Sequence, residues 1–419
     1  MTRSGFSIGA ALLALGFGCQ AEPHAASAGN MPADPSPSAG TRTVIGHAAG
    51  EASGGEAMGG EANGGAAAVD AGGAGASEGG APQLPPFGSV EVVTSLAEGC
   101  LPPAGGEPHL VLPASASNPV YDRLGSIAGR RFATSRDGQA LFTFDASGNV
   151  STILNNVGAA ASNGTQLSVV FQDTTQTILQ RYDENLVAQG DSEPLADGPV
   201  SSLALAATSK ALLVSWLEGG QLIVRVFAGD SSSELSVQLS ESSTRCQAQA
   251  VAAGTNFAIA WLCAGTPNEV GWALVSNSAK LLKRSVVLQT SAALDLVALA
   301  TAANGHAVLL HSLEEKTAYI ANVDMDGQLE GSIRAISGLP QAFDLAATES
   351  GLSLSALLED GTTALGRIGN DGAPSSADTW TCLDQASPGG CAALEALELG
   401  DSALVRYANG SEWLLDVPF

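Results

Sequence analysis

Short apolar segments separated by turn residues recur along most of the chain. The clearest example spans residues 202–239, where four segments of six residues each are separated by Ser, Lys, Gly, Glu and Asp. Six residues is the usual length of a β-strand and too short for a typical helix. We therefore predict four antiparallel strands at 202–207, 212–217, 222–227 and 234–239.

This unit repeats with a period of about 45 residues, which identifies the architecture before any single motif does. Turn signals followed by apolar segments fall at Gly129, Asn163-Gly164, Ser209, Gly254-Thr255, Asn304-Gly305, Ser350-Gly351 and Gly400-Asp401. Four short strands per repeat of about 40–50 residues are typical of a propeller blade. We predict an all-β fold, a β-propeller of seven four-stranded blades, with six or eight blades as alternatives.

The composition of the strands indicates where each one lies in a blade. The first strand of each repeat is rich in Ala, as in residues 203–207 and 248–253, which suits the place where blades converge on the axis. The second strand carries larger side chains, which we expect to fill the core between blades: Phe171, Trp216, Trp261, His311 and Leu357. A helical solenoid is the alternative, because segments such as 294–313 are rich in Ala and Leu.

The last repeat lacks a fourth strand, since 393–399, 404–407 and 412–417 account for only three. Residues 89–96 alternate in polarity like a strand and precede the first repeat. We expect them to pair beside 412–417 and close the ring, because closure removes two free sheet edges.

The N-terminus has the features of an export signal. Residues 1–19 contain Arg3 followed by an uncharged, largely apolar run that is too short to span a bilayer. The run ends in Leu15-Gly16-Phe17-Gly18-Cys19, which resembles the lipobox of bacterial lipoproteins and implies lipid attachment at Cys19, although Phe17 departs from that pattern. The chain is then expected to be lipid-anchored in the cell envelope, at the outer membrane or cell surface. Cleavage after Ala21, which would give a secreted soluble protein, is the alternative.

Residues 20–87 are expected to form a disordered linker. The segment from Gln20 to Pro86 has no Phe, Trp or Tyr, and its second half consists mainly of Gly, Ala and Glu. Such a segment cannot bury enough apolar surface to offset the entropy of ordering. The predicted domains are therefore a signal peptide at 1–19, a linker at 20–87 and a β-propeller at 88–419.

The charge of the chain narrows the range of partners. There are 42 Asp and Glu against 17 Lys and Arg, a formal net charge of −25. So acidic a surface repels phosphate backbones and anionic lipid headgroups, which argues against nucleic-acid binding and leaves the membrane accessible only through a lipid anchor. Basic partners and cations remain compatible with it.

The sequence has six cysteines, and if Cys19 is lipidated or lost with the signal, five remain in a compartment that permits disulfides. A two-residue turn at Gly254-Thr255 places Cys246 directly opposite Cys263, at a non-hydrogen-bonded site where Cα atoms approach to about 4.5 Å. Cys382 and Cys391 flank the expected link between the last two blades and are predicted to pair. Cys100 remains, and it could instead take either of those two as its partner.

Motifs for metal, nucleotide or nucleophile chemistry are absent from the sequence, so we expect no metal and no cofactor. On its repeat length and turn placement, the segment 88–419 resembles secreted bacterial β-propellers, and this resemblance implies a fold without a function. We expect a monomeric binding or scaffold module for a protein or carbohydrate ligand. The alternative from a different class is a propeller-type hydrolase or lyase with carboxylates at the axial mouth.

Overall fold

The computed structural model describes residues 90–93, 109–112, 121–135, 140–145, 150–239, 245–265, 267–348, 351–369, 380–386, 393–399, 402–407 and 412–416. All of these lie in one compact unit, which includes Gly80–Phe419. The predicted signal peptide with Cys19 and the predicted linker lie outside the described residues. Within the described part of the chain, no helix is both long enough and apolar enough to cross a membrane.

The four-strand repeat predicted at residues 202–239 is present. Its strands are β11 (Ser201–Ala207), β12 (Leu212–Glu218), β13 (Gln221–Ala228) and β14 (Ser231–Gln238), each antiparallel to the next. Burial is highest in β12 and β13 and low in β14, as expected for a meander with two central strands and one strand at the outer edge.

The described strands pair into seven sheets of this kind. Before β11–β14 come β3 (Tyr121–Ile127), β4 (Arg130–Ser135), β5 (Ala140–Phe144) and β6 (Val150–Asn155), and then β7 (Val157–Ser162), β8 (Leu167–Gln172), β9 (Thr177–Tyr182) and β10 (Ala188–Ala196). After it come β15 (Arg245–Ala253), β16 (Asn256–Ala264), β17 (Asn268–Val275) and β18 (Leu281–Thr290).

The remaining sheets complete the series. One contains β19 (Asp295–Ala302), β20 (Gly305–Ser312), β21 (Thr317–Asp324) and β22 (Ile333–Ser337), with β1 (Val90–Val93) as a fifth strand. The next contains β23 (Gln341–Ala347), β24 (Gly351–Leu357), β25 (Thr363–Gly369) and β26 (Trp380–Cys382), followed by a short 3-10 helix, η1 (Leu383–Ala386). The last contains β27 (Ala393–Leu399), β28 (Ser402–Tyr407), β29 (Glu412–Asp416) and β2 (His109–Leu112).

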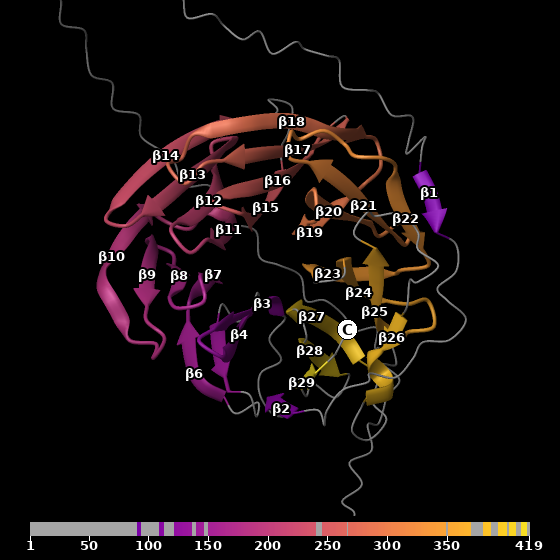
Figure 1. The fold of residues 1–419 in the computed structure, drawn as a ribbon, viewed down its shortest axis with the longest axis horizontal. Helices are drawn as coiled ribbons and strands as arrows, with labels where there is room; N and C mark the ends of the chain where they lie inside the picture. Colours follow the sequence, from indigo (N-terminus) through magenta and orange to yellow (C-terminus); the bar gives the residue numbers. More distant parts are fainter. Residues whose placement is uncertain are drawn as a thin grey trace, which may run out of the picture. The chain divides into compact units, whose positions relative to one another are not determined.

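The sheets are arranged around a central axis, with the first strand of each repeat innermost (Figure 1). The innermost strands contact one another in chain order, from β3 to β27, and β27 contacts β3. The all-β propeller with four-stranded blades is thus confirmed. The helical alternative is wrong: residues 294–313 contain β19 and β20, because the Asn304-Gly305 turn separates two strands.

The core lies between adjacent sheets. Ala248 and Ala250 of β15 are buried in one cluster with Ala204 and Ala206 of β11, so small side chains let the innermost strands approach closely. Of the larger residues predicted to fill this core, Trp216, Trp261 and His311 are buried, whereas Phe171 and Leu357 are partly exposed.

The predicted closure of the ring through residues 89–96 is wrong in its choice of segment. The strand beside β29 is β2, antiparallel, with Leu110 opposite Trp413. β1 instead lies parallel to β22, with Val90 opposite Ile333. The reason is chain connectivity, since β2 ends eight residues before β3 and so reaches the junction of first and last sheets directly, whereas β1 lies far enough upstream to pair elsewhere.

Candidate functional site

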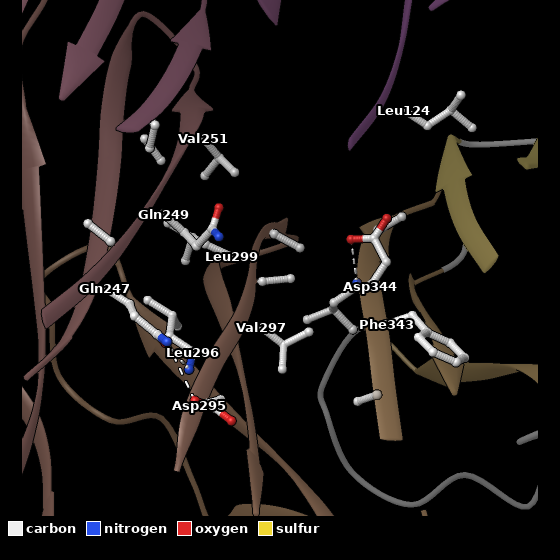
Figure 2. A pocket seen from close by; sticks show the side chains of 18 of the residues that line it. Leu124, Gln247, Gln249, Val251, Asp295, Leu296, Val297, Leu299, Phe343 and Asp344 are labelled. Atoms are coloured by element: carbon white, nitrogen blue, oxygen red, sulfur yellow. Dashed lines mark hydrogen bonds between the residues drawn. The ribbon is translucent and has the colours of Figure 1, made fainter. Parts of the chain in front are cut away.

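The innermost strands enclose an axial channel with a volume of about 1300 Å³. Its described lining comes from β3, β7, β11, β15, β19 and β23, together with side chains from the following strands of some sheets. Figure 2 shows the part of the channel between β15, β19 and β23. One end, which we call the Leu313 mouth, is formed by Asp295, His311, Leu313, Gln341 and Leu357.

Most of the channel surface is uncharged. Small and branched apolar side chains such as Ala159, Leu203, Val251 and Val297 alternate with polar ones. The polar residues of the lining are Thr134, Ser202, Gln247, Gln249, Thr301, His311 and Gln341, and the charged ones are Asp295, Asp344 and Arg406. Primary amides both donate and accept hydrogen bonds, so the three glutamines suit a ligand that presents both kinds of group.

Hydrogen bonds between sheets fix part of this lining. The hydroxyl of Ser202 in β11 accepts a bond from the backbone N–H of Ala248 in β15 at 2.6 Å. The side-chain amide oxygen of Gln247, Oε1, in turn accepts a bond from the backbone N–H of Leu296 in β19 at 2.9 Å. Further along, the Thr301 hydroxyl donates to the Ala252 carbonyl at 3.0 Å. β11, β15 and β19 are thereby joined in series along the channel, which preorganises this sector.

The two carboxylates of the lining lie on neighbouring innermost strands. Asp295 begins β19 at the Leu313 mouth and is exposed, with Gln247 Nε2 at 3.5 Å from its Oδ1. Asp344 is partly exposed in β23, and its Oδ1 accepts the backbone N–H of Leu345 at 2.8 Å. In the view of Figure 2, Val297 lies between them. Among the described residues, no group of three or more His, Cys, Asp or Glu side chains is placed to hold a metal ion.

Acidic residues outside the channel have local roles in the turns. Oδ1 of Asp183 accepts the backbone N–H groups of Asn185 and Val187, both at 2.9 Å. Asp324, in the Asp-Met-Asp-Gly run, does the same for Asp326 and Gln328, at 2.8 Å each. These carboxylates stabilise turns between third and fourth strands, as expected of Asp at such positions.

Asp173 has a comparable role at the opposite face. It lies between β8 and β9, where the Thr175 hydroxyl and the backbone N–H groups of Thr175 and Gln176 lower the pKa of its carboxyl group. The acidity of both faces is therefore explained in part by turn formation.

The disulfide predicted between Cys246 and Cys263 is confirmed. The two residues are directly opposite in β15 and β16, with a Cα–Cα distance of 4.1 Å, and Ala253 pairs with Asn256 across the turn as expected. Cys382 also forms a disulfide. Cys391 and Cys100 lie outside the described residues, so the pairing of Cys382 with Cys391 stays a prediction.

The glutamines of the channel were not predicted as site residues. A usable signal exists in β15, where Gln247 and Gln249 alternate with Ala248 and Ala250 in a strand already placed at the axis by its alanines. Polar residues at alternate positions of an innermost strand mark the side that faces the channel. The sequence around Arg406 gives no comparable signal. Arg406 lies in β28, the second strand of its sheet, which is not an innermost strand.

No protein-family model matches the sequence, and no curated protein matches it. Among solved structures, a streptogramin B lyase has a TM-score of 0.50 at 14% identity, covering 74% of this chain and 97% of that one. A catalytically inactive virginiamycin B lyase from Staphylococcus aureus with quinupristin has a TM-score of 0.48 at 10% identity, covering 74% and 98%. BamB from Moraxella catarrhalis has a TM-score of 0.43 at 11% identity, covering 71% and 86%. At such identities the likeness to the streptogramin B lyase supports the fold alone.

Proposed function

We propose that this protein is an exported binding module whose axial channel takes a basic polypeptide segment at the Leu313 mouth. The observation that carries the proposal is the channel itself, a cavity of about 1300 Å³ lined by both apolar and polar groups, with three glutamine amides, two carboxylates and the Arg406 guanidinium. Concave sites with apolar walls and a few placed polar groups are the usual form of ligand sites.

The Leu313 mouth has features of a docking surface. Leu313 is 70% exposed, the highest value among the large hydrophobic residues described, and it lines the channel. Glu314 and Glu315 follow it, and Asp295 lies at the same end. An exposed apolar side chain followed in sequence by two acidic residues favours a partner with both apolar and basic groups, and the net charge of −25 acts in the same direction.

An enzymatic function as a hydrolase or lyase has less support. Such chemistry needs acidic groups that converge on one reacting atom, with one of them poised to give up or take a proton. Asp344 is engaged with the backbone of its own strand, and Asp295 lies near Gln247 at the edge of the channel. Among the described residues, the carboxyl group whose pKa is raised by burial is that of Asp384; it accepts hydrogen bonds from the backbone N–H groups of Ala393 and Thr363 and is not part of the channel lining.

The ring is proposed to consist of seven blades, one for each of the seven sheets. The contact of β27 with β3 supports closure without a further blade.

We also propose export and lipid attachment at Cys19, with residues 20–87 as the tether. Mass spectrometry of the mature N-terminus tests lipid attachment: a diacylated Cys19 is expected, and an unmodified chain that starts at Glu22 would contradict it.

Peptide and oligosaccharide arrays, probed at physiological salt with the purified chain, test the ligand class. We expect signal on peptides that combine Lys or Arg with apolar residues, and a weaker signal in Gln249→Trp, whose indole would narrow the channel. A matched variant, Gln238→Trp, changes an exposed residue of β14 at the outer edge and should bind as the parent does. Binding restricted to oligosaccharides, or equal binding by the Gln249→Trp variant, would contradict the proposal.

Asp295→Asn and Asp344→Asn separate binding from catalysis. In a binding module, each is expected to weaken the affinity for basic peptides by roughly twofold to fivefold, as for loss of an exposed or partly exposed charge pair. If either variant instead abolishes chemical conversion of an array hit by the parent protein, the channel is an active site.

A further inference from the structure

Six of the seven innermost strands share an irregularity near their first residues. In each, the pairing register with the second strand shifts by one residue, because the innermost strand has one more unpaired residue there than the second strand; in β11, two residues lie opposite one. In β19, for example, Leu296 is opposite Leu310 and Ala298 is opposite Leu309, so Val297 is inserted. The equivalent shift occurs in β3, β7, β11, β23 and β27. Such β-bulges bend a strand, increase its twist and change which side chains face each side.

β15 is the exception. Its nine residues pair with β16 without interruption, from Ala253 opposite Asn256 to Arg245 opposite Ala264. It is also the innermost strand that carries the Cys246–Cys263 disulfide. From each cysteine to the Gly254-Thr255 turn there are seven residues, so the two arms of this hairpin are equal in length.

A covalent link between directly opposite residues forbids an inserted residue between the link and the turn. The two arms are equal in length and the turn has two residues. If one residue of β15 between Cys246 and the turn were left unpaired in a bulge, residue 245 would lie opposite Cys263, and the Cys246 side chain would point to the other face of the sheet. The disulfide prevents this, because its Cα atoms must stay within bonding range.

The register of β15 decides where Gln247 lies. Residues 247, 249 and 251 are partly exposed, whereas Ala248 and Ala250 are buried against β11. In this register, Oε1 of the Gln247 side chain accepts a hydrogen bond from the backbone N–H of Leu296. If Ala248 were the unpaired residue of a bulge, residue 246 would replace Gln247 opposite Leu262. The hydrogen bond between Gln247 and Leu296 would then be lost.

We propose that the Cys246–Cys263 disulfide is a positioning element of the channel: it suppresses in β15 the bulge that the other innermost strands carry, and so holds Gln247 against β19. This goes beyond the proposed function, since it holds whatever the channel binds. A purely stabilising disulfide, which acts by restricting the unfolded chain, would leave the register unchanged when removed.

Two engineered disulfide traps distinguish the registers. Arg245→Cys with Cys246→Ala places a thiol that is opposite Cys263 only after the shift. Arg245→Cys with Ala264→Cys, in a Cys246→Ala and Cys263→Ala background, places two thiols that are opposite only in the present register. We expect the first trap to close under mild oxidation and the second to remain mostly as free thiols, measured by peptide mapping of non-reduced protein.

Amide exchange gives the second readout. In the Cys246→Ala/Cys263→Ala variant, the Leu296 amide is expected to exchange at least roughly tenfold faster than in the parent, because it loses its acceptor. Gln247→Ala with the disulfide intact is the control, since it should accelerate exchange at Leu296 while the register stays fixed. If the double variant does not fold, the same exchange is measured on the parent after reduction under native conditions. A closed second trap together with a protected Leu296 amide would overturn the proposal.

Discussion

Several aromatic rings are packed over a glycine on the neighbouring strand. Trp261 is opposite Gly271, Phe132 is opposite Gly125, and Trp380 is opposite Gly366. At each glycine, an added Cβ would overlap the ring. These are glycines in ordinary extended backbone, so the absence of a side chain serves packing rather than turn formation.

Gly271→Ala should therefore lower the free energy of unfolding by about 1–3 kcal/mol, the usual cost of overpacking a core. Trp261 is fully buried, and the Arg284 guanidinium lies 5.7 Å from the centre of its ring, so the indole has little room to shift. Denaturant unfolding measures the change. In a Trp261→Leu background the same substitution should cost markedly less, and an equal cost in both backgrounds would show that the ring is not the obstacle.

His306 is a buried histidine in a small cavity of about 120 Å³ formed with Asn304, Asn322 and Glu330. It is 1% exposed, and its ring lies 5.6 Å from that of Trp272 in the next sheet. No hydrogen-bond partner for either ring nitrogen is present among the described residues. Burial accordingly lowers the pKa of His306 from 6.5 to about 4.

This histidine should make the fold sensitive to acid. Because the pKa of His306 is lower in the folded state, the unfolded chain binds more protons at this residue than the folded chain does between pH 6.5 and about pH 4. Its neutral form is fully compatible with folding above pH 6.5, and stability is lost as pH falls through that interval. From pH 7 to pH 4, the parent should lose about 3 kcal/mol more than His306→Phe, which keeps the packing on Trp272. Parallel pH profiles for both proteins would contradict this.

Turn chemistry acts at the scale of the hairpin. The turn between β3 and β4 contains Ala128 with a φ of 45° and Gly129 with a φ of 80°, so an exposed alanine adopts the left-handed conformation that suits Asn or Gly. The backbone N–H of Ala128 donates to the Gly164 carbonyl of the next hairpin at 2.9 Å, which holds the turn in place.

Ala128→Asn should stabilise the protein by about 0.5–1 kcal/mol, because Asn tolerates this conformation and the backbone bond to Gly164 is retained. Ala128→Val is the matched opposite, and its β-branched side chain should destabilise the same turn. Thermal unfolding of the two variants gives the comparison. An Asn variant no more stable than the parent would show that the turn carries no strain at position 128.

The turns and strand lengths explain which features of the hairpins could be predicted from the sequence alone. Turn residues at a regular spacing predicted the hairpins, and equal counting from Gly254-Thr255 predicted the register of Cys246 and Cys263, because a two-residue turn leaves no freedom in pairing. The bulges of the other innermost strands could not be predicted, since an inserted residue such as Val297 has the same apolar character as its neighbours. Of the channel glutamines, Gln247 and Gln249 were visible only as an alternation in β15, whose meaning depends on which strand is innermost.

Closure of the ring is a property of the whole molecule. Two segments upstream of the first repeat have strand character, and apolar alternation alone favours the wrong one for the junction. β2 completes the last sheet, whereas β1 adds a parallel strand outside β22. The deciding information is distance along the chain from β3, which periodicity does not contain.

The two segments should therefore differ in their effect on stability. A chain that starts at residue 95 lacks β1 but keeps every strand of the four-stranded series, so we expect its free energy of unfolding to fall by only about 1–2 kcal/mol, the scale of a few backbone hydrogen bonds. A chain that starts at residue 117 also lacks β2, which leaves β29 as an unpaired edge at the junction of first and last sheets. For this chain we expect a loss on the order of 3 kcal/mol or more and a tendency to associate through that edge. Because the second truncation also removes Cys100, full-length Cys100→Ser is its control, and unfolding together with light scattering is measured for all three. Should the chain from 95 be the less stable of the two, the ring would depend on β1, and the assignment of β2 as the closing strand would fail.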